Sequence, residues 1–200
     1  MPSPFSFLLL FFFLSLSSPP LPVAGRNHDC SEPASDLVRS SCVHANYPTI
    51  CLQTLSSYSG PAKTPRDLAL AAVNVSLARA TRVSKYLNGI GNANTNAGAS
   101  KRQRSALSDC VEQIGDTVND LSKSLSELQH LRGETFRWQM SNAETWVSAA
   151  LTNEDTCLDG FQDVGGKLKE DVKRKVTNVA RVTSNALYMI NRLEETRREP

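Results

Sequence analysis

Residues 106–128 read ALSDCVEQIGDTVNDLSKSLSEL, and their large apolar side chains recur at alternating spacings of four and three residues. Because 3.6 residues make one turn of an α-helix, these spacings place the side chains along one side of a single helix. A line of this length must be buried against other helices. Its members are Leu107, Val111, Ile114, Val118, Leu121, Leu125 and Leu128.

The helical period continues on both sides of this segment, and the two-residue alternation typical of strands is absent. One long helix is predicted to begin near Thr64, its N-cap, and to end in the Gly/Asn-rich loop 88–100. Two more are predicted over 136–161 and 167–195, with the charged end from residue 191 fraying. In the 136–161 helix, one line is expected to contain Trp146, Ala150, Asn153 and Cys157, and the residues beside it are Val147, Leu151, Leu158 and Phe161.

Two short helical segments precede the long ones, over about 34–45 and 48–57. Pro48 cannot continue the first segment, but it suits the first turn of the second. Four long helices with short connections favour an antiparallel arrangement. The predicted fold is therefore all-α: an antiparallel up-down-up-down four-helix bundle with an N-terminal helical hairpin.

The N-terminus has the features of a secretory signal peptide. Residues 1–25 carry no charge, and the apolar run FSFLLLFFFLSL at 5–16 is shorter than the roughly 20 residues that a membrane span needs. We expect a signal peptide at 1–25 and one domain at 26–200. The mature form would be secreted and would lack a membrane segment.

The charge balance gives no reason to expect a nucleic-acid partner. The formal net charge is only +2, and the basic residues of 167–175 are interleaved with acidic and apolar residues at helical spacing. This pattern favours a solvated helix face over a dedicated polyanion site.

Five cysteines in a secreted chain favour disulfide bonds. The turn between the second and third long helices centres near Gly133, with Cys110 lying 23 residues before it and Cys157 24 residues after it. In an antiparallel pair these two positions lie opposite each other, which predicts a Cys110–Cys157 bridge. Cys42 and Cys51 flank Pro48 and can close the short hairpin. Cys30 is left over and is expected to be free, the alternative being a disulfide between two molecules.

The sequence offers few residues for catalysis. His28, His44 and His130 have no partners at metal-binding spacing, and no nucleophile elbow, phosphate loop or dinucleotide fingerprint occurs. We therefore expect a non-enzyme without metal or cofactor. The sequon at Asn74 is a possible N-glycosylation site, although it falls within a predicted helix.

Four stretches resemble the plant invertase and pectin methylesterase inhibitor family. They are SSCVHANYPTICLQTLSSY at 40–58, the segment at 106–128, WVSAALTNEDTCLDGF at 146–161 and SNALYMINRL at 184–193. The resemblance implies a four-helix bundle with an N-terminal hairpin and two disulfides in sequence order. Cys30 departs from it, because the family's extra cysteine often lies in the last helix.

The resemblance also implies a partner. Segment 146–161 is similar to the pectin methylesterase branch, and the connection LRGETFRWQMSNAE at 131–144 lacks the Pro-Lys-Phe motif typical of the invertase branch. The expected function is a secreted inhibitor of pectin methylesterase in the cell wall, or apoplast. The alternatives are an inhibitor of acid invertase and a non-inhibitory structural or storage relative.

The family's contact positions fall on the helices that the cysteines join. Glu112, Asp116 and Asn119 recur at i, i+4 and i+7 beside the apolar line, and Thr156 precedes the last framework cysteine. In similar inhibitors, residues at these positions face the target enzyme. These four residues are therefore the candidate partner-binding residues, and the expected mechanism is steric exclusion of substrate.

Overall fold

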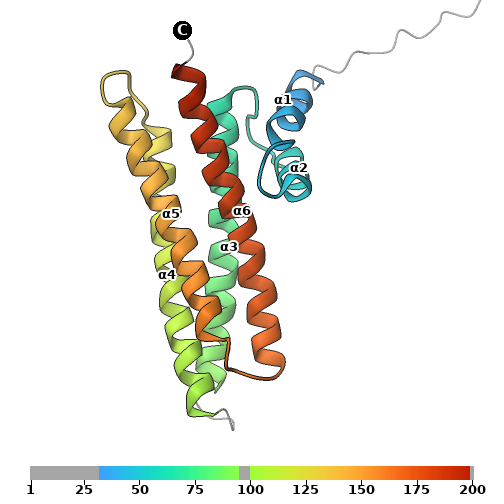
Figure 1. Ribbon diagram of the computed structural model, residues 1–200, viewed down its shortest axis with the longest axis vertical. Helices are drawn as coiled ribbons and strands as arrows, with labels where there is room; N and C mark the ends of the chain where they lie inside the picture. The colour runs from blue at the N-terminus through green and yellow to red at the C-terminus, as the bar shows by residue number, and fades with distance from the viewer. Residues whose placement is uncertain (1–31, 95–99, 199–200) are drawn as a thin grey trace, which may run out of the picture.

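The computed structural model describes residues 32–94 and 100–198, and within these ranges the chain is helical with no strand (Figure 1). The predicted signal peptide, His28 and Cys30 lie outside the described residues. None of the described helices is long and apolar enough to cross a membrane. The helices are α1 (Glu32–Cys42), α2 (Pro48–Ser56), α3 (Pro65–Asn94), α4 (Lys101–Gln129), α5 (Phe136–Gly160) and α6 (Lys167–Arg198).

The four long helices form one antiparallel bundle in which each helix packs against its two neighbours in the order α3, α4, α5, α6 and back to α3. Short connections join successive helices, so their directions alternate (Figure 1). The hairpin of α1 and α2 packs beside α3 and α6, on the side of the bundle away from α4 and α5. The predicted fold is confirmed.

Side-chain caps set the starts of two long helices. At α3, the Thr64 hydroxyl accepts a hydrogen bond from the Asp67 amide (3.1 Å), and the Asp67 carboxylate accepts one from the Thr64 amide (3.0 Å). Ser100 and Gln103 form the same reciprocal capping box at α4. Thr64 is thus the N-cap that the sequence predicted.

Two helix ends were predicted wrongly. Helix α3 continues to Asn94 instead of ending at residue 88, and α6 continues to Arg198 instead of fraying from residue 191. Gly89 and Gly91 contribute no side chain to a neighbour, and open space surrounds both. Each glycine makes the free energy of helix formation about 1 kcal/mol less favourable than alanine would. The favourable extension of a long, packed helix offsets this cost.

Helix α4 is rotated about its axis relative to the prediction, so only part of the predicted apolar line faces the bundle interior. Leu107, Ile114, Leu121 and Leu128 are fully buried, whereas Val111, Val118 and Leu125 are half-buried and pack at its edge. The other buried residues of α4 are mainly small or polar: Ala106, Cys110, Thr117, Asp120 and Ser124.

The inner line predicted for α5 was half right. Ala150 and Cys157 are buried, but Trp146 and Asn153 are only half-buried at the border with α4. A second line faces the interior at seven-residue spacing: Met140, Val147, Glu154 and Phe161. The sequence placed Val147 and Phe161 beside the first line, but it did not indicate that Met140 and Glu154 are buried. A glutamate therefore occupies a position of the bundle core.

The hairpin is tied both to itself and to α6. The Cys42–Cys51 disulfide closes α1 onto α2 with the Cα atoms 5.5 Å apart. The Tyr47 amide donates to the Asn185 side chain at 2.9 Å, and the Asn185 amide group donates back to the Tyr47 carbonyl at 3.0 Å. These bonds fix the turn between α1 and α2 against the last helix.

Candidate partner-binding face

Helices α4 and α5 meet through three pairs of small residues in strict antiparallel register. Cys110 is bonded to Cys157, and the Thr117 and Ser124 hydroxyls donate to the carbonyls of Ala150 (3.3 Å) and Ala143 (3.0 Å). Each step of seven residues along α4 is matched by a step of seven residues back along α5. Small side chains let the two backbones approach closely, and the Cα atoms of the disulfide are only 4.4 Å apart.

All four predicted partner-binding residues are exposed on this helix pair. Glu112, Asp116 and Asn119 lie on the outer side of α4, and Thr156 lies on α5. Because the Cys110–Cys157 bridge joins the helices beside them, Glu112 and Thr156 belong to the same end of the pair. The Thr156 hydroxyl donates to the Thr152 carbonyl at 2.7 Å, which leaves its oxygen able to accept a bond from a partner.

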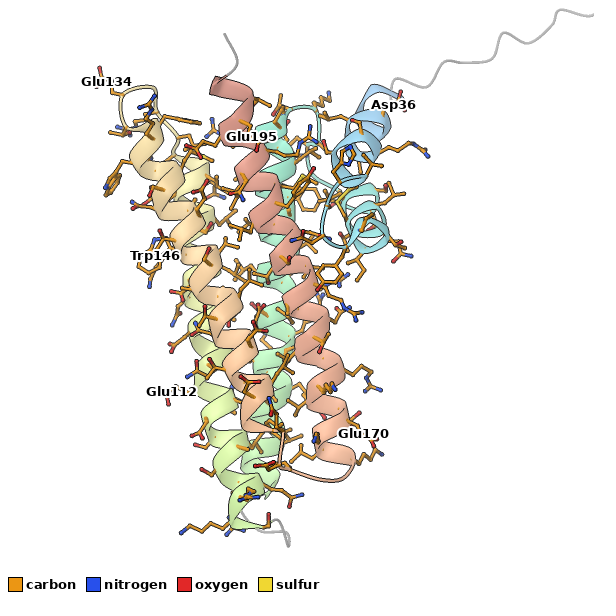
Figure 2. The ribbon with its side chains drawn as sticks, in the orientation of Figure 1. Asp36, Glu112, Glu134, Trp146, Glu170 and Glu195 are labelled. Atoms are coloured by element: carbon orange, nitrogen blue, oxygen red, sulfur yellow. A yellow bond between two sulfur atoms is a disulfide. The ribbon has the colours of Figure 1, made fainter. Side chains whose placement is uncertain are left out.

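Glu112 and Trp146 both point outward from the α4/α5 side of the bundle, away from the hairpin (Figure 2). We call the exposed outer surface of α4 and α5 around Glu112, Asp116, Asn119 and Thr156 the α4/α5 face. Near the middle of this helix pair lies a polar cluster that was not predicted from the sequence. It consists of Asp120, Lys123, Trp146 and Asn153.

In this cluster the Asp120 carboxylate is the central acceptor. It is paired with the Lys123 ammonium (3.1 Å) and accepts a bond from the Asn153 side chain (3.2 Å). The Lys123 ammonium also lies 4.0 Å from the centre of the Trp146 ring, a cation–π contact. The network links the two helices on their solvent side, in the middle of the α4/α5 face.

The turn end of the face is also ordered by side chains. The buried Gln139 side chain accepts from the Arg132 amide and the Thr135 hydroxyl, both at 2.9 Å, and donates to the His130 carbonyl at 2.9 Å. Trp138, which directly precedes Gln139, is 65% exposed, an unusual state for so large an apolar side chain. The exposure of Trp138 could have been predicted from the sequence, because position 138 falls outside both buried lines of α5.

Glu154 lies on the opposite side of α5, in contact with α6. It is 0% exposed, and one carboxyl oxygen accepts a bond from the Thr183 hydroxyl at 2.8 Å. The other oxygen is buried without a hydrogen-bond partner among the described residues. Burial, reinforced by the charge of Asp155 and opposed by the Thr183 bond, raises the pKa of Glu154 to about 8. The carboxyl is therefore neutral at mildly acidic pH.

The possible glycosylation site is part of a packed helix. The half-buried Asn74 side chain donates to the Leu70 carbonyl at 2.9 Å, and the Ser76 hydroxyl of the same sequon is fully buried. An attached glycan would require this stretch to be modified before α3 joins the bundle. The sequon at Asn74 marks a possible acceptor, and its place in a packed helix disfavours occupancy.

Within the described ranges, no three His, Cys, Asp or Glu residues gather closely enough to hold a metal ion. The α4/α5 face instead combines a rigid helical support with exposed carboxylate, amide, hydroxyl and indole groups. Such a surface is suited to binding a macromolecular partner through contacts made without rearrangement.

Comparison with known proteins identifies the family to which this helical bundle belongs. Residues 36–189 match the family model described as "Plant invertase/pectin methylesterase inhibitor". The chain belongs to this family.

Individual relatives agree with that assignment. The chain is 50% identical over 196 residues to Pectinesterase inhibitor 3 of Arabidopsis thaliana, covering 94% of each chain. It is 40% identical to Pectinesterase inhibitor 9 of the same plant, covering 82% of this chain and 83% of the relative. A crystal structure of a mutant pectin methylesterase inhibitor from Arabidopsis has the same fold: the TM-score is 0.62 at 24% identity, covering 75% of this chain and 92% of that one.

Proposed function

We propose that this protein is a secreted, non-catalytic inhibitor of pectin methylesterase. The observation that carries the proposal is the 50% identity, over nearly the whole of both chains, to a protein named as a pectinesterase inhibitor. The family also includes invertase inhibitors by its description. The named relatives favour the pectin methylesterase branch, as does the absence of the Pro-Lys-Phe motif from residues 131–144.

In the proposed mechanism, the α4/α5 face docks non-covalently over the active-site cleft of the enzyme and excludes the pectin chain. Glu112, Asp116, Asn119 and Thr156 supply the polar contacts. Their helices are joined by the Cys110–Cys157 bridge and by the Asp120 network, so docking orders little that is not already ordered. The consequence would be limited demethylesterification of pectin in the cell wall.

The proposal is tested by titrating the purified, oxidised mature protein into separate assays of pectin methylesterase and acid invertase. We expect pectin methylesterase activity to fall to a plateau near one inhibitor per enzyme and invertase activity to stay unchanged. Inhibition of invertase alone would show that the protein belongs to the invertase-inhibitor branch of its family. Loss of neither activity, with a panel of isoforms of each enzyme, would indicate a non-inhibitory relative.

A further inference from the structure

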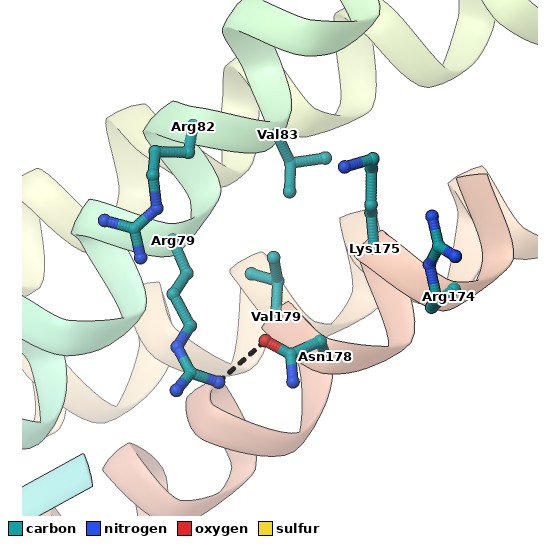
Figure 3. Close-up of a pocket in the computed structure, with 7 residues that line it drawn as sticks. All are labelled: Arg79, Arg82, Val83, Arg174, Lys175, Asn178 and Val179. Carbon is teal, nitrogen blue, oxygen red and sulfur yellow. Dashed lines mark hydrogen bonds between the residues drawn. The ribbon is translucent and has the colours of Figure 1, made fainter. Parts of the chain in front are cut away.

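A second surface, on the other side of the bundle, is strongly basic. A groove of about 520 Å³ runs between α3 and α6, with positively charged side chains on both walls (Figure 3). The buried Val83 and Val179 form its apolar floor. The remaining lining residues are Arg79 and Arg82 of α3 and Arg174, Lys175 and Asn178 of α6.

The positive charge of this groove is little compensated. Among the described residues, Arg174 alone of the four cations forms an ion pair, with Asp171 at 2.7 Å. Arg79 donates to the neutral Asn178 side chain at 2.7 Å (Figure 3), and the Lys175 ammonium lies 4.3 Å from the centre of the Tyr86 ring. Partial burial, and then the nearby charge of Arg82, lower the pKa of Arg79. The groove thus brings four positively charged side chains close together on two packed helices, α3 and α6.

The cations lie at two levels along the groove. Arg79 is opposite Asn178, and Arg82 is near the level of Lys175, because α3 and α6 run antiparallel. The rise of an α-helix separates the levels by about 5 Å. A linear ligand with repeated negative charges could contact both levels and both walls at the same time.

We infer that the α3/α6 groove binds a linear polyuronate, a polysaccharide with a carboxylate on each sugar. This inference rests on the proposed function, because removal of methyl esters from pectin exposes such carboxylates. Arginine matches the geometry of carboxylates well, and the apolar floor suits the C–H faces of sugar rings. The inhibitor would thereby be retained where its target enzyme has already acted.

The position of the groove is compatible with simultaneous binding of the enzyme. Helices α3 and α6 form the side of the bundle opposite α4 and α5 (Figure 1), so a polysaccharide in the groove leaves the α4/α5 face open. The two ligands also have different requirements: the groove offers cations, whereas the predicted contacts Glu112 and Asp116 are acidic.

The test is direct binding of the oxidised mature protein to de-esterified oligogalacturonate of about ten sugars, measured by calorimetry at low and moderate salt. No enzyme is present, so the result is independent of the inhibition assays. We expect binding that weakens with salt and is lost with the fully methyl-esterified oligomer. The double variant Arg82→Gln/Lys175→Gln should bind at least about tenfold more weakly, consistent with the loss of two charged contacts.

The matched control is Lys101→Gln/Arg102→Gln, which removes the same charge from the exposed start of α4 and should bind within about twofold of wild type. Equal losses in the two variants would show general charge attraction instead of a groove site. Undetectable binding of the oligomer, or stronger binding to vesicles containing phosphatidylserine, would overturn the inference. The groove variant should still inhibit pectin methylesterase. If the wild-type protein binds the oligomer but inhibits no enzyme, the proposed function is wrong and the inferred polyuronate site stands.

Discussion

The side-chain amide of Asn185 pairs with both backbone groups of Tyr47, which lies 138 residues earlier in the chain. Asn185 is 4% exposed and Tyr47 is 40% exposed, so these bonds are partly buried. The side chain satisfies an N–H and a C=O of the hairpin turn much as a peptide group of a neighbouring strand would. One residue of α6 therefore fixes the hairpin to the bundle.

We expect Asn185→Ala to lower the free energy of unfolding by about 1–3 kcal/mol, because the Tyr47 amide loses its partner in a partly buried setting. The Tyr47 carbonyl keeps the hydrogen bond from the Cys51 amide at 2.9 Å. Urea denaturation measures the change, and hydrogen exchange at the Tyr47 amide should become faster. The control is Asn46→Ala, which removes only the exposed bond from Asn46 to the Ser184 hydroxyl and should cost less than about 0.5 kcal/mol. Similar losses in both variants would contradict the special role of Asn185.

The two disulfides should contribute unequally to stability. Cys110–Cys157 closes 47 residues and Cys42–Cys51 only 9, so loop entropy gives about 4 and 2.6 kcal/mol respectively. We expect Cys110→Ala/Cys157→Ala to lower the melting temperature more than Cys42→Ala/Cys51→Ala. Cys30→Ser is the reference and should change it little. An equal loss on replacing Cys30 would show that this cysteine belongs to the framework.

Glu154 should make the protein less stable as the pH rises. Its pKa is raised from 4.5 to about 8 in the folded state, so between these values the folded protein holds a proton that the unfolded chain has released. The free energy of unfolding therefore falls from about pH 4.5 and levels off above about pH 8, by a few kcal/mol in total. Glu154→Gln should flatten this dependence in urea denaturation at pH 5 and pH 8.

The control for Glu154 is the exposed neighbour Asp155, because Asp155→Asn leaves the buried carboxyl in place. That variant should retain most of the pH dependence. An undiminished slope in Glu154→Gln would mean that other groups cause it.

The α4/α5 face is tested by changing Glu112→Gln, Asp116→Asn and Thr156→Ala together. If these residues lie at the centre of the contact, the inhibition constant for pectin methylesterase should rise at least about thirtyfold. The core should be unaffected, because all three side chains are exposed, and circular dichroism should show unchanged helicity.

A matched triple variant removes the same groups elsewhere: Asp36→Asn, Glu170→Gln and Ser57→Ala. Asp36 and Glu170 lie on the hairpin side of the molecule, away from Glu112 (Figure 2). This variant should inhibit as wild type does. If the first triple variant stays within about twofold of wild type, the contact surface lies elsewhere on the bundle.

The bundle was predictable because a short turn fixes the register of an antiparallel helix pair. Residues equally distant from the turn at 130–135 face each other, and this placed Cys110 opposite Cys157 before any coordinates were known. The apolar line of α4 was equally clear. Its rotation was not, since it buries the polar residues Thr117 and Ser124 against α5, where their hydroxyls reach carbonyl groups. The Thr117 hydroxyl also reaches the Gln113 carbonyl of its own helix at 3.0 Å.

Glu154 shows why some core positions were missed. Glutamate on a helix is usually exposed, so it was not assigned to the interior. A signal existed in its spacing, seven residues from both Val147 and Phe161 in an otherwise apolar series. Part of the basic groove was visible as the basic residues of 167–175, which the sequence favoured as a solvated face. The groove itself was not visible, because its second wall comes from α3 and depends on how α3 and α6 are rotated against each other.

The position of the Cys110–Cys157 bridge has a consequence for resistance to proteases. Residues 130–135 form the turn at one end of the α4/α5 pair, and the disulfide joins the helices near the other end. A trypsin-like cut after the exposed Arg132 would therefore leave both fragments covalently attached, still packed through Thr117 and Ser124. A protein nicked there should migrate as two pieces only after reduction, and its α4/α5 face should outlast the cleavage.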